Sequence, residues 1–140
     1  MLSRVVVFTL ICSLALSAFP SDDYEYGTPA DLKGLTTYYL NTQTDTETRD
    51  KVAAKVRVET DRLHLASVRD EARIFVDVLG DDHNDDGASF VIWVAGKEGR
   101  HRVIQKFSYT HSNFPKLRPT SRFARDFARM WRDAQDASSK

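Results

Sequence analysis

Hydrophobic and polar positions follow the two-residue period of strands in some stretches of the chain and the spacing of helices in others. Apolar and polar side chains alternate over residues 72–79, while β-branched and aromatic residues dominate 35–40, 63–68 and 103–109. Each of these segments predicts a strand. Residues 89–94 are apolar on both faces, which predicts a central strand covered on both sides.

Two segments have the spacing of helices. Residues 44–59 begin with threonines and acidic residues, as helix N-termini do, and place Val52 and Val56 near one face. The second helix begins at Pro119 and carries a stronger apolar stripe, made of Phe123, Phe127, Met130, Trp131 and Ala134. This stripe predicts that the last helix packs against a sheet.

The elements follow the order β-α-β-β-β-β-α, with a tight hairpin connection at residues 96–99. This order is typical of an α+β fold. We expect a two-layer sandwich in which a mostly antiparallel sheet of four to five strands carries both helices on one face. The folded domain should span residues 32–137, and residues 19–31, which are polar and contain Gly27 and Pro29, should form a tether before it.

The first residues have the layout of a secretory signal peptide. Arg4 supplies a positive charge, residues 5–19 are a run of apolar or small residues, and the chain becomes polar from Pro20 onward. The run is shorter than the roughly 20 residues that a helix needs to cross a bilayer. We therefore expect residues 1–18 to be cleaved on export to a periplasmic or secreted location, leaving no membrane span. An uncleaved anchor or a buried hydrophobic helix is the alternative.

The single cysteine, Cys12, lies in the middle of this leader, where it is poorly placed for lipidation. The domain after the leader therefore has no thiol, which excludes a disulfide, a thiolate metal site and a cysteine nucleophile. The stability of the domain must come from its hydrophobic core.

Charge is unevenly distributed although the formal net charge is +0. Residues 19–96 contain eight basic and sixteen acidic side chains, and residues 97–132 contain ten basic and two acidic ones. Such a dipolar field can steer a partner, but opposite halves can also face one another across a folded surface. Nucleic acid is not an expected partner of an exported protein.

An acidic stretch resembles the start of a calcium loop. Asp82, Asn84 and Asp86, followed by Gly87, match its alternating oxygen ligands and its glycine turn. The twelfth position, which should hold a bidentate glutamate, is Trp93 in a predicted strand. The alternative is a solvated hairpin loop rich in turn-forming residues, and we expect no metal or other cofactor.

The last helix carries arginines opposite its apolar stripe. They recur at spacings of three and four residues, within an arc of about 80°, and are Arg122, Arg125, Arg129 and Arg132. Such a ridge is a candidate site for an anionic polymer or for phosphate-bearing headgroups. Its alternative is an ordinary solvated helix face.

The sheet face away from the helices is a candidate protein contact. If Ile74 and Val76 face the helices, Phe75 and Leu79 must point the other way. One side of the central strand 89–94 joins them, although the sequence leaves open which side. A large apolar patch there should be covered by a second copy or by an envelope protein. The alternative is that residues 22–30 or the loop 111–119 fold over it.

Several short segments also resemble a known group of proteins. They are residues 32–35 with Leu32 and Leu35, residues 38–40, the helix start at Thr44 to Thr46, and Arg69 to Ala72 before an apolar strand. Across residues 27–135 the chain resembles small exported bacterial proteins of unknown function. It is more distantly similar to envelope domains of lipopolysaccharide-assembly lipoproteins. The resemblance implies a fold and a compartment and transfers no catalytic residue.

These features predict an exported, non-enzymatic binding or assembly domain of the bacterial envelope. No Gly-x-Ser-x-Gly elbow, metal-ligand histidine pair or glycine-rich phosphate loop occurs in the sequence. A calcium- or anion-binding module, and a small hydrolase or inhibitor without a recognisable motif, remain the alternatives.

Overall fold

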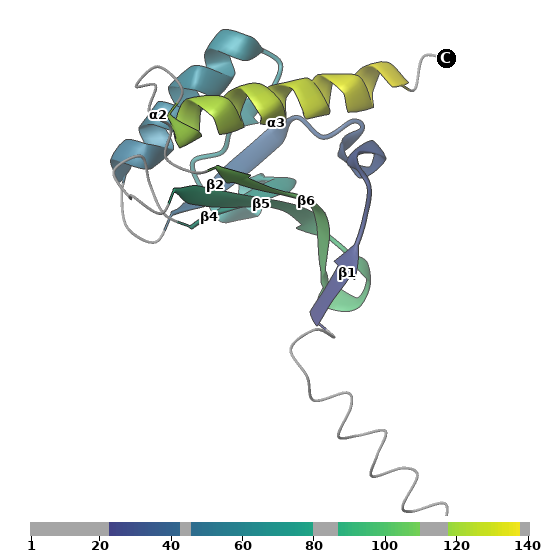
Figure 1. Ribbon diagram of the computed structural model, residues 1–140. Coiled ribbons are helices and arrows are strands. Elements are labelled where there is room, and N and C mark those ends of the chain that lie inside the picture. Colours follow the sequence, from purple (N-terminus) through teal and green to yellow (C-terminus); the bar gives the residue numbers. More distant parts are fainter. Residues whose placement is uncertain (1–22, 43–45, 80–86, 110–117, 138–140) are drawn as a thin grey trace, which may run out of the picture.

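A six-stranded sheet forms one layer of the structure, and two helices that lie on one of its faces form the other (Figure 1). The computed structural model describes residues 23–42, 46–79, 87–109 and 118–137. The strands are β1 (Tyr24–Tyr26), β2 (Thr37–Thr42), β3 (His64–Leu65), β4 (Ile74–Leu79), β5 (Ala88–Ala95) and β6 (His101–Tyr109). The helices are α2 (Thr46–Glu59) and α3 (Pro119–Asp136), and the short 3-10 turns are η2 (Pro29–Leu32), η3 (Arg69–Glu71) and η4 (Lys97–Gly99). The expected α+β sandwich is confirmed.

The sheet is mixed, whereas a mostly antiparallel sheet of four to five strands was expected. Its order is β1-β6-β5-β4-β2-β3. β4, β5 and β6 pair antiparallel, but β2 runs parallel to both β3 and β4, and β1 runs parallel to β6. β2 runs parallel to its neighbours because α2 carries the chain from the end of β2 back to the start of β3.

Two segments differ from their expected form. In the described part of the expected tether, residues 23–31, the chain forms β1 and the first residues of η2. β1 is held by polar contacts, which a hydropathy pattern does not reveal, and η2 by the buried Leu32. Glu25 accepts a hydrogen bond from the Lys97 backbone N–H at 2.6 Å and lies 3.6 Å from the Arg102 guanidinium. The expected strand 63–68 is reduced to β3, because the chain turns away after the Ala66 N–H bonds to the Tyr38 carbonyl.

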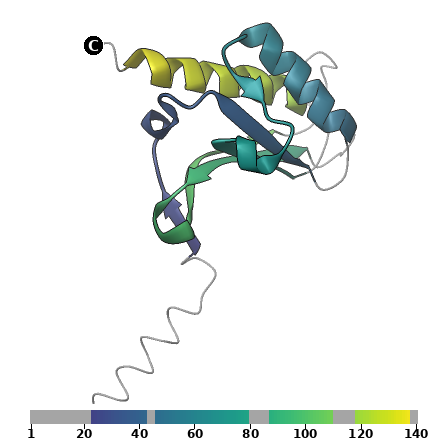
Figure 2. The ribbon, with the colours of Figure 1, turned by 180° about the vertical axis from the view of Figure 1, so that it is seen from behind.

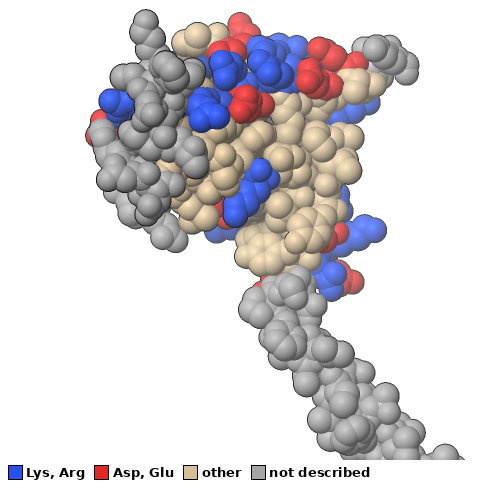
Figure 3. Space-filling view, viewed as in Figure 1, with Lys and Arg blue, Asp and Glu red and all other residues tan. Residues whose placement is uncertain are grey.

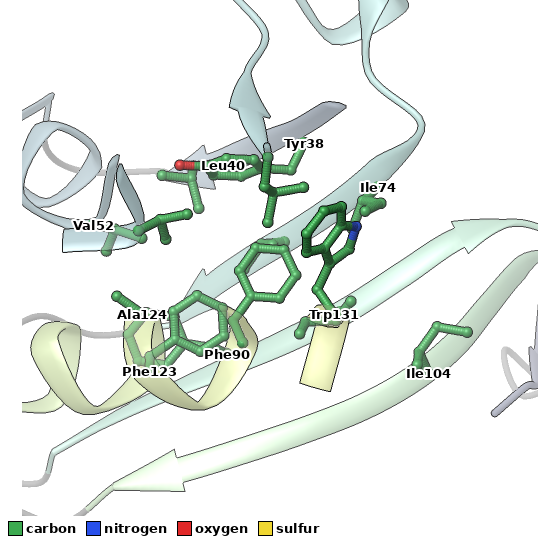
Figure 4. Packing of buried hydrophobic residues seen from close by; sticks show 14 of the residues in the cluster. Tyr38, Leu40, Val52, Ile74, Phe90, Ile104, Phe123, Ala124 and Trp131 are labelled. Atoms are coloured by element: carbon green, nitrogen blue, oxygen red, sulfur yellow. The ribbon is translucent and has the colours of Figure 1, made fainter. Parts of the chain in front are cut away.

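The core lies between the sheet and the helices, and Figure 4 shows its aromatic centre. Phe90 of β5 stacks on Phe123 of α3 with ring centroids 4.1 Å apart. Tyr38 of β2 meets Phe127 edge-on at 5.5 Å. Phe123, Phe127 and Trp131 are fully buried, so the predicted apolar stripe of the last helix does pack against the sheet.

Hydrogen bonds fix the position of α3 as well. The Trp131 indole N–H donates to the Leu35 carbonyl at 2.6 Å, and the Arg132 guanidinium donates to the Glu59 carbonyl at the end of α2, also at 2.6 Å. Gln135 donates to the Leu32 carbonyl at 2.9 Å. These bonds join α3 to η2, to the segment before β2 and to α2. None of the helices in the described ranges is long and apolar enough to span a membrane.

Candidate interaction surface on the outer sheet face

The structure settles which side of the central strand faces the helices. Ile74, Val76 and Val78 of β4 are buried on the helix side, and so are Phe90 and Ile92 of β5. Side chains alternate along a strand. Phe75, Leu79 and Trp93 therefore point to the outer face, the face without helices.

Aromatic rings form a row across this outer face. Phe75 and Trp93 are cross-strand partners whose rings stack with centroids 4.3 Å apart. His101 of β6 stacks on the other side of Trp93 at 3.7 Å, and Tyr24 of β1 meets His101 edge-on at 5.8 Å. Tyr39 pairs with Phe75 at the β2 end. We call these five residues, Tyr24, His101, Trp93, Phe75 and Tyr39, the aromatic row.

Arginine side chains lie over the aromatic row. The Arg69 guanidinium, from η3, lies 5.7 Å from the Phe75 ring centroid and 5.6 Å from that of Trp93. Figure 2 shows η3 beside the strands and apart from α2 and α3. Arg49 lies over Tyr39 at 5.6 Å. Such cation–π contacts contribute about 0.5–1 kcal/mol each at exposed sites.

Part of the outer face is therefore covered by the chain itself. Trp93 is only 4% exposed, beneath Arg69 and between its stacked neighbours. Of the internal covers that the sequence suggests, residues 22–30 contribute Tyr24, which meets His101, and most of the loop 111–119 lies outside the described residues. Arg69 of η3 is a cover that the pattern does not predict. Its covering role could not be read from the pattern, because Arg69 approaches Trp93 only through the crossover from β3 to β4.

The Tyr24 end of the aromatic row is open to solvent, whereas Tyr39 at the other end is half-buried, and exposed hydrophobic side chains also lie near the row on β4 and β1. Leu79 is 53% exposed at the end of β4, and Tyr24 and Tyr26 are 48% and 88% exposed in β1. The Trp93 indole N–H is buried and has no hydrogen-bond acceptor among the described residues. A buried donor without a partner costs about 1–3 kcal/mol. The aromatic row therefore contains one unsatisfied hydrogen-bond donor, the Trp93 N–H.

The arginines predicted to form a ridge on α3 do not act as one group. Arg132 is bonded to the Glu59 carbonyl and lies 4.0 Å from its carboxylate. Arg122 lies over the Tyr109 ring at 4.8 Å. Arg125 and Arg129 are exposed, but acidic side chains alternate with basic ones along this surface (Figure 3).

Tyr109 ties the end of β6 to α3. Its hydroxyl donates to the Asp126 carboxylate at 2.6 Å. Burial and this hydrogen bond raise the pKa of Tyr109 well above its usual value. Burial also raises the pKa of Tyr38, in the core, to about 12. Both phenols therefore stay neutral at physiological pH.

The candidate calcium loop, with Asp82, Asn84 and Asp86, lies outside the described residues. Within the described ranges, histidine, aspartate and glutamate side chains do not gather into a group of three that could hold a metal ion. No protein-family model and no curated protein matches this sequence.

Proposed function

We propose that the chain is an exported, non-enzymatic binding domain of the bacterial envelope, which contacts a second copy or another envelope protein through its outer sheet face. Export is inferred from the leader, residues 1–18. The observation that carries the contact is the aromatic row, which lies on the sheet face that has no helix layer, is exposed at Tyr24 and has the exposed Leu79 beside it on β4.

The aromatic row supports binding because its rings are already ordered. Trp93 is held between Phe75 and His101 before any partner arrives. A partner that packs on this surface therefore loses little side-chain entropy there, and rigid aromatic residues are enriched among the residues that dominate binding energy. Leu79 and Tyr24 extend the contact to either end.

Arg69 has a defined part in this proposal. Its guanidinium covers Phe75 and Trp93 in the unbound protein. A partner carboxylate can pair with Arg69, and only if this pairing moves Arg69 off the ring could a partner oxygen reach the buried Trp93 N–H. The surface thus favours a partner that presents apolar side chains next to acidic ones.

Leu79→Glu tests the proposal, and Val58→Glu is its control. Both residues are exposed aliphatic side chains, but Val58 lies on α2, away from the outer face, and is 82% exposed. We expect light scattering on the protein, alone and with detergent-extracted envelope proteins, to show a complex with the wild type and with Val58→Glu. Leu79→Glu should remain folded and lose that complex. A monomer in all three proteins, or a complex in all three, contradicts the proposal.

A further inference from the structure

Only the first residues of β6 are paired with a strand on both edges. β5 pairs with β6 along its length, from His101 to Tyr109, whereas β1 pairs with His101, Arg102 and Val103 alone. Beyond Val103, none of the described strands lies on the β1 side of β6. We call residues 105–109 on this side the free edge.

The chain itself explains why β1 stops where it does. The Gly27 N–H donates to the Val103 carbonyl at 2.8 Å, which is the last hydrogen bond of this pairing. The Thr28 N–H then donates to the Asp31 carboxylate at 2.9 Å, and Pro29 has no N–H to offer. The chain turns into η2 at this point and leaves the rest of the β6 edge unpaired.

The ladder shows which backbone groups point to the free edge. At the hairpin, the Gly96 N–H donates to the Arg100 carbonyl at 2.8 Å. Hydrogen-bonded pairs recur at every second position of an antiparallel ladder. Back along β5 from Gly96 these positions are Val94, Ile92 and Phe90, and the one-residue shift between Ile92 and Trp93 makes Gln105 and Phe107 the partners of the last two. The β6 residues between these pairs direct their N–H and C=O groups away from β5, towards the free edge. On the free edge these residues are Lys106 and Ser108.

A hollow lies beside the free edge, between β6, η2 and α3. Its volume is about 380 Å³, and its lining residues are Pro29, Phe107, Asp126, Arg129, Met130 and Asp133. Phe107 and Met130 are partly buried members of the core that reach the surface here. The surface over β6 is mostly uncharged below the charged side chains of α3 (Figure 3). A strand added to β6 would therefore place an inward-pointing side chain against apolar groups.

We propose that the free edge of β6 binds an extended segment of a partner polypeptide, which adds to the sheet as a further strand. Backbone groups of Lys106 and Ser108 supply the pairing, and the hollow receives one apolar side chain of the added strand. Recognition of this kind combines main-chain hydrogen bonds with pockets for alternate side chains. At about 3.3 Å per residue, the free edge matches a segment of roughly five residues.

Charge favours an acidic partner segment over a second copy of this chain. Within the described ranges, Lys106 on the free edge and Arg125 and Arg129 on α3 make no ion pair within 4.0 Å. Asp126 and Asp133 line the hollow beside Arg129, so the favourable position for an acidic partner residue is next to Lys106. Two β6 edges paired about Phe107 would bring both Lys106 side chains into diagonal positions on one face, where like charges repel. An added strand whose acidic residues lie beside Lys106, on the face opposite to its apolar residue, meets this cation favourably.

A matched pair of variants tests the proposal. Ser108→Pro removes the free-edge N–H and should leave the hydrogen bonds to β5 intact, because proline is tolerated on an edge strand whose N–H faces solvent. Ser108→Ala is the control, since it also loses the contact between the hydroxyls of Ser89 and Ser108, which lie 3.1 Å apart. Thermal melting should show that both variants remain folded.

The probe is a phage-displayed library of random twelve-residue peptides, selected on the purified protein. We expect the selected peptides to alternate apolar with other residues and to be enriched in Asp and Glu. Ser108→Pro should weaken their binding about tenfold relative to Ser108→Ala, and Leu79→Glu should have no effect. The proposal is overturned if no peptide is selected, if both Ser108 variants bind equally, or if Leu79→Glu removes binding. Self-association that only Ser108→Pro abolishes would assign the edge to a second copy and overturn the choice of partner.

Discussion

Replacement of Trp131 by alanine should be among the most damaging single changes to the fold. The side chain is fully buried in α3, and its indole N–H donates to the Leu35 carbonyl at 2.6 Å. Deleting a large buried aromatic costs about 3–5 kcal/mol, because transfer free energy is lost and a cavity remains. The unpaired Leu35 carbonyl adds about 1 kcal/mol or more where water cannot reach it. We therefore expect Trp131→Ala to lower the free energy of unfolding by about 4–6 kcal/mol.

Urea unfolding followed by circular dichroism measures this loss. Arg129→Ala is the control on the same helix, because Arg129 is exposed and makes no ion pair in the described structure. It should change the free energy of unfolding by less than about 0.5 kcal/mol. Equal and small effects of the two substitutions would mean that α3 does not dock on the sheet, and the two-layer arrangement would then be wrong.

Two further predictions concern titration and processing. Because burial raises the pKa of Tyr38 from 10.0 to about 12, the folded state favours the neutral phenol, so its contribution to stability should be complete below pH 10 and lost between pH 10 and 12. Urea unfolding between pH 10 and 12 should show that the free energy of unfolding falls less with pH in Tyr38→Phe than in the wild type. An equal fall in both proteins would contradict this prediction. N-terminal sequencing of protein from the native host should find Ala18 or Phe19 first, and recovery of the whole chain in the membrane fraction would refute the signal peptide.

The helix-facing half of the fold could be predicted because its residues obey simple periods. Ile74, Val76 and Val78 recur at every second position of β4, and all three lie in the core. The stripe of α3 follows the helical period, and Phe123 and Trp131 are fully buried as expected. Local periodicity determines which side of an element is apolar, and burial of that side fixes the layer arrangement.

The remaining features depend on contacts between distant segments, which periodicity does not report. β1 is polar and short, and it stays on the sheet because Glu25 meets Lys97 and Arg102. Arg69 covers Trp93 only because the crossover from β3 to β4 passes over the outer face. The choice between the two sides of β5 likewise required the register with β4.

Sequence reasoning placed Phe75 and Leu79 on the outer face correctly, but it missed the aromatic row that joins them to β6 and β1. His101 follows a hairpin turn and carries no signal of its own in the hydrophobic pattern. Its stacking on Trp93 at 3.7 Å depends on the β5–β6 register, which pairs His101 with Ala95 and Val103 with Trp93. Once the strand order is known, the pairing of aromatic residues on neighbouring strands, such as Phe75 with Trp93 and Tyr39 with Phe75, indicates the row.

Site-specific photo-cross-linking in the native host tests the central claim, that the outer sheet face contacts a partner, most directly. A photoreactive phenylalanine analogue is placed at Leu79 or at Val58, both exposed aliphatic positions on opposite sides of the domain. We predict one discrete cross-linked product from position 79 and none from position 58. Excess wild-type protein should reduce the product from position 79 by competing for the partner. Absence of a product at position 79, or the same product from both positions, would contradict the claim.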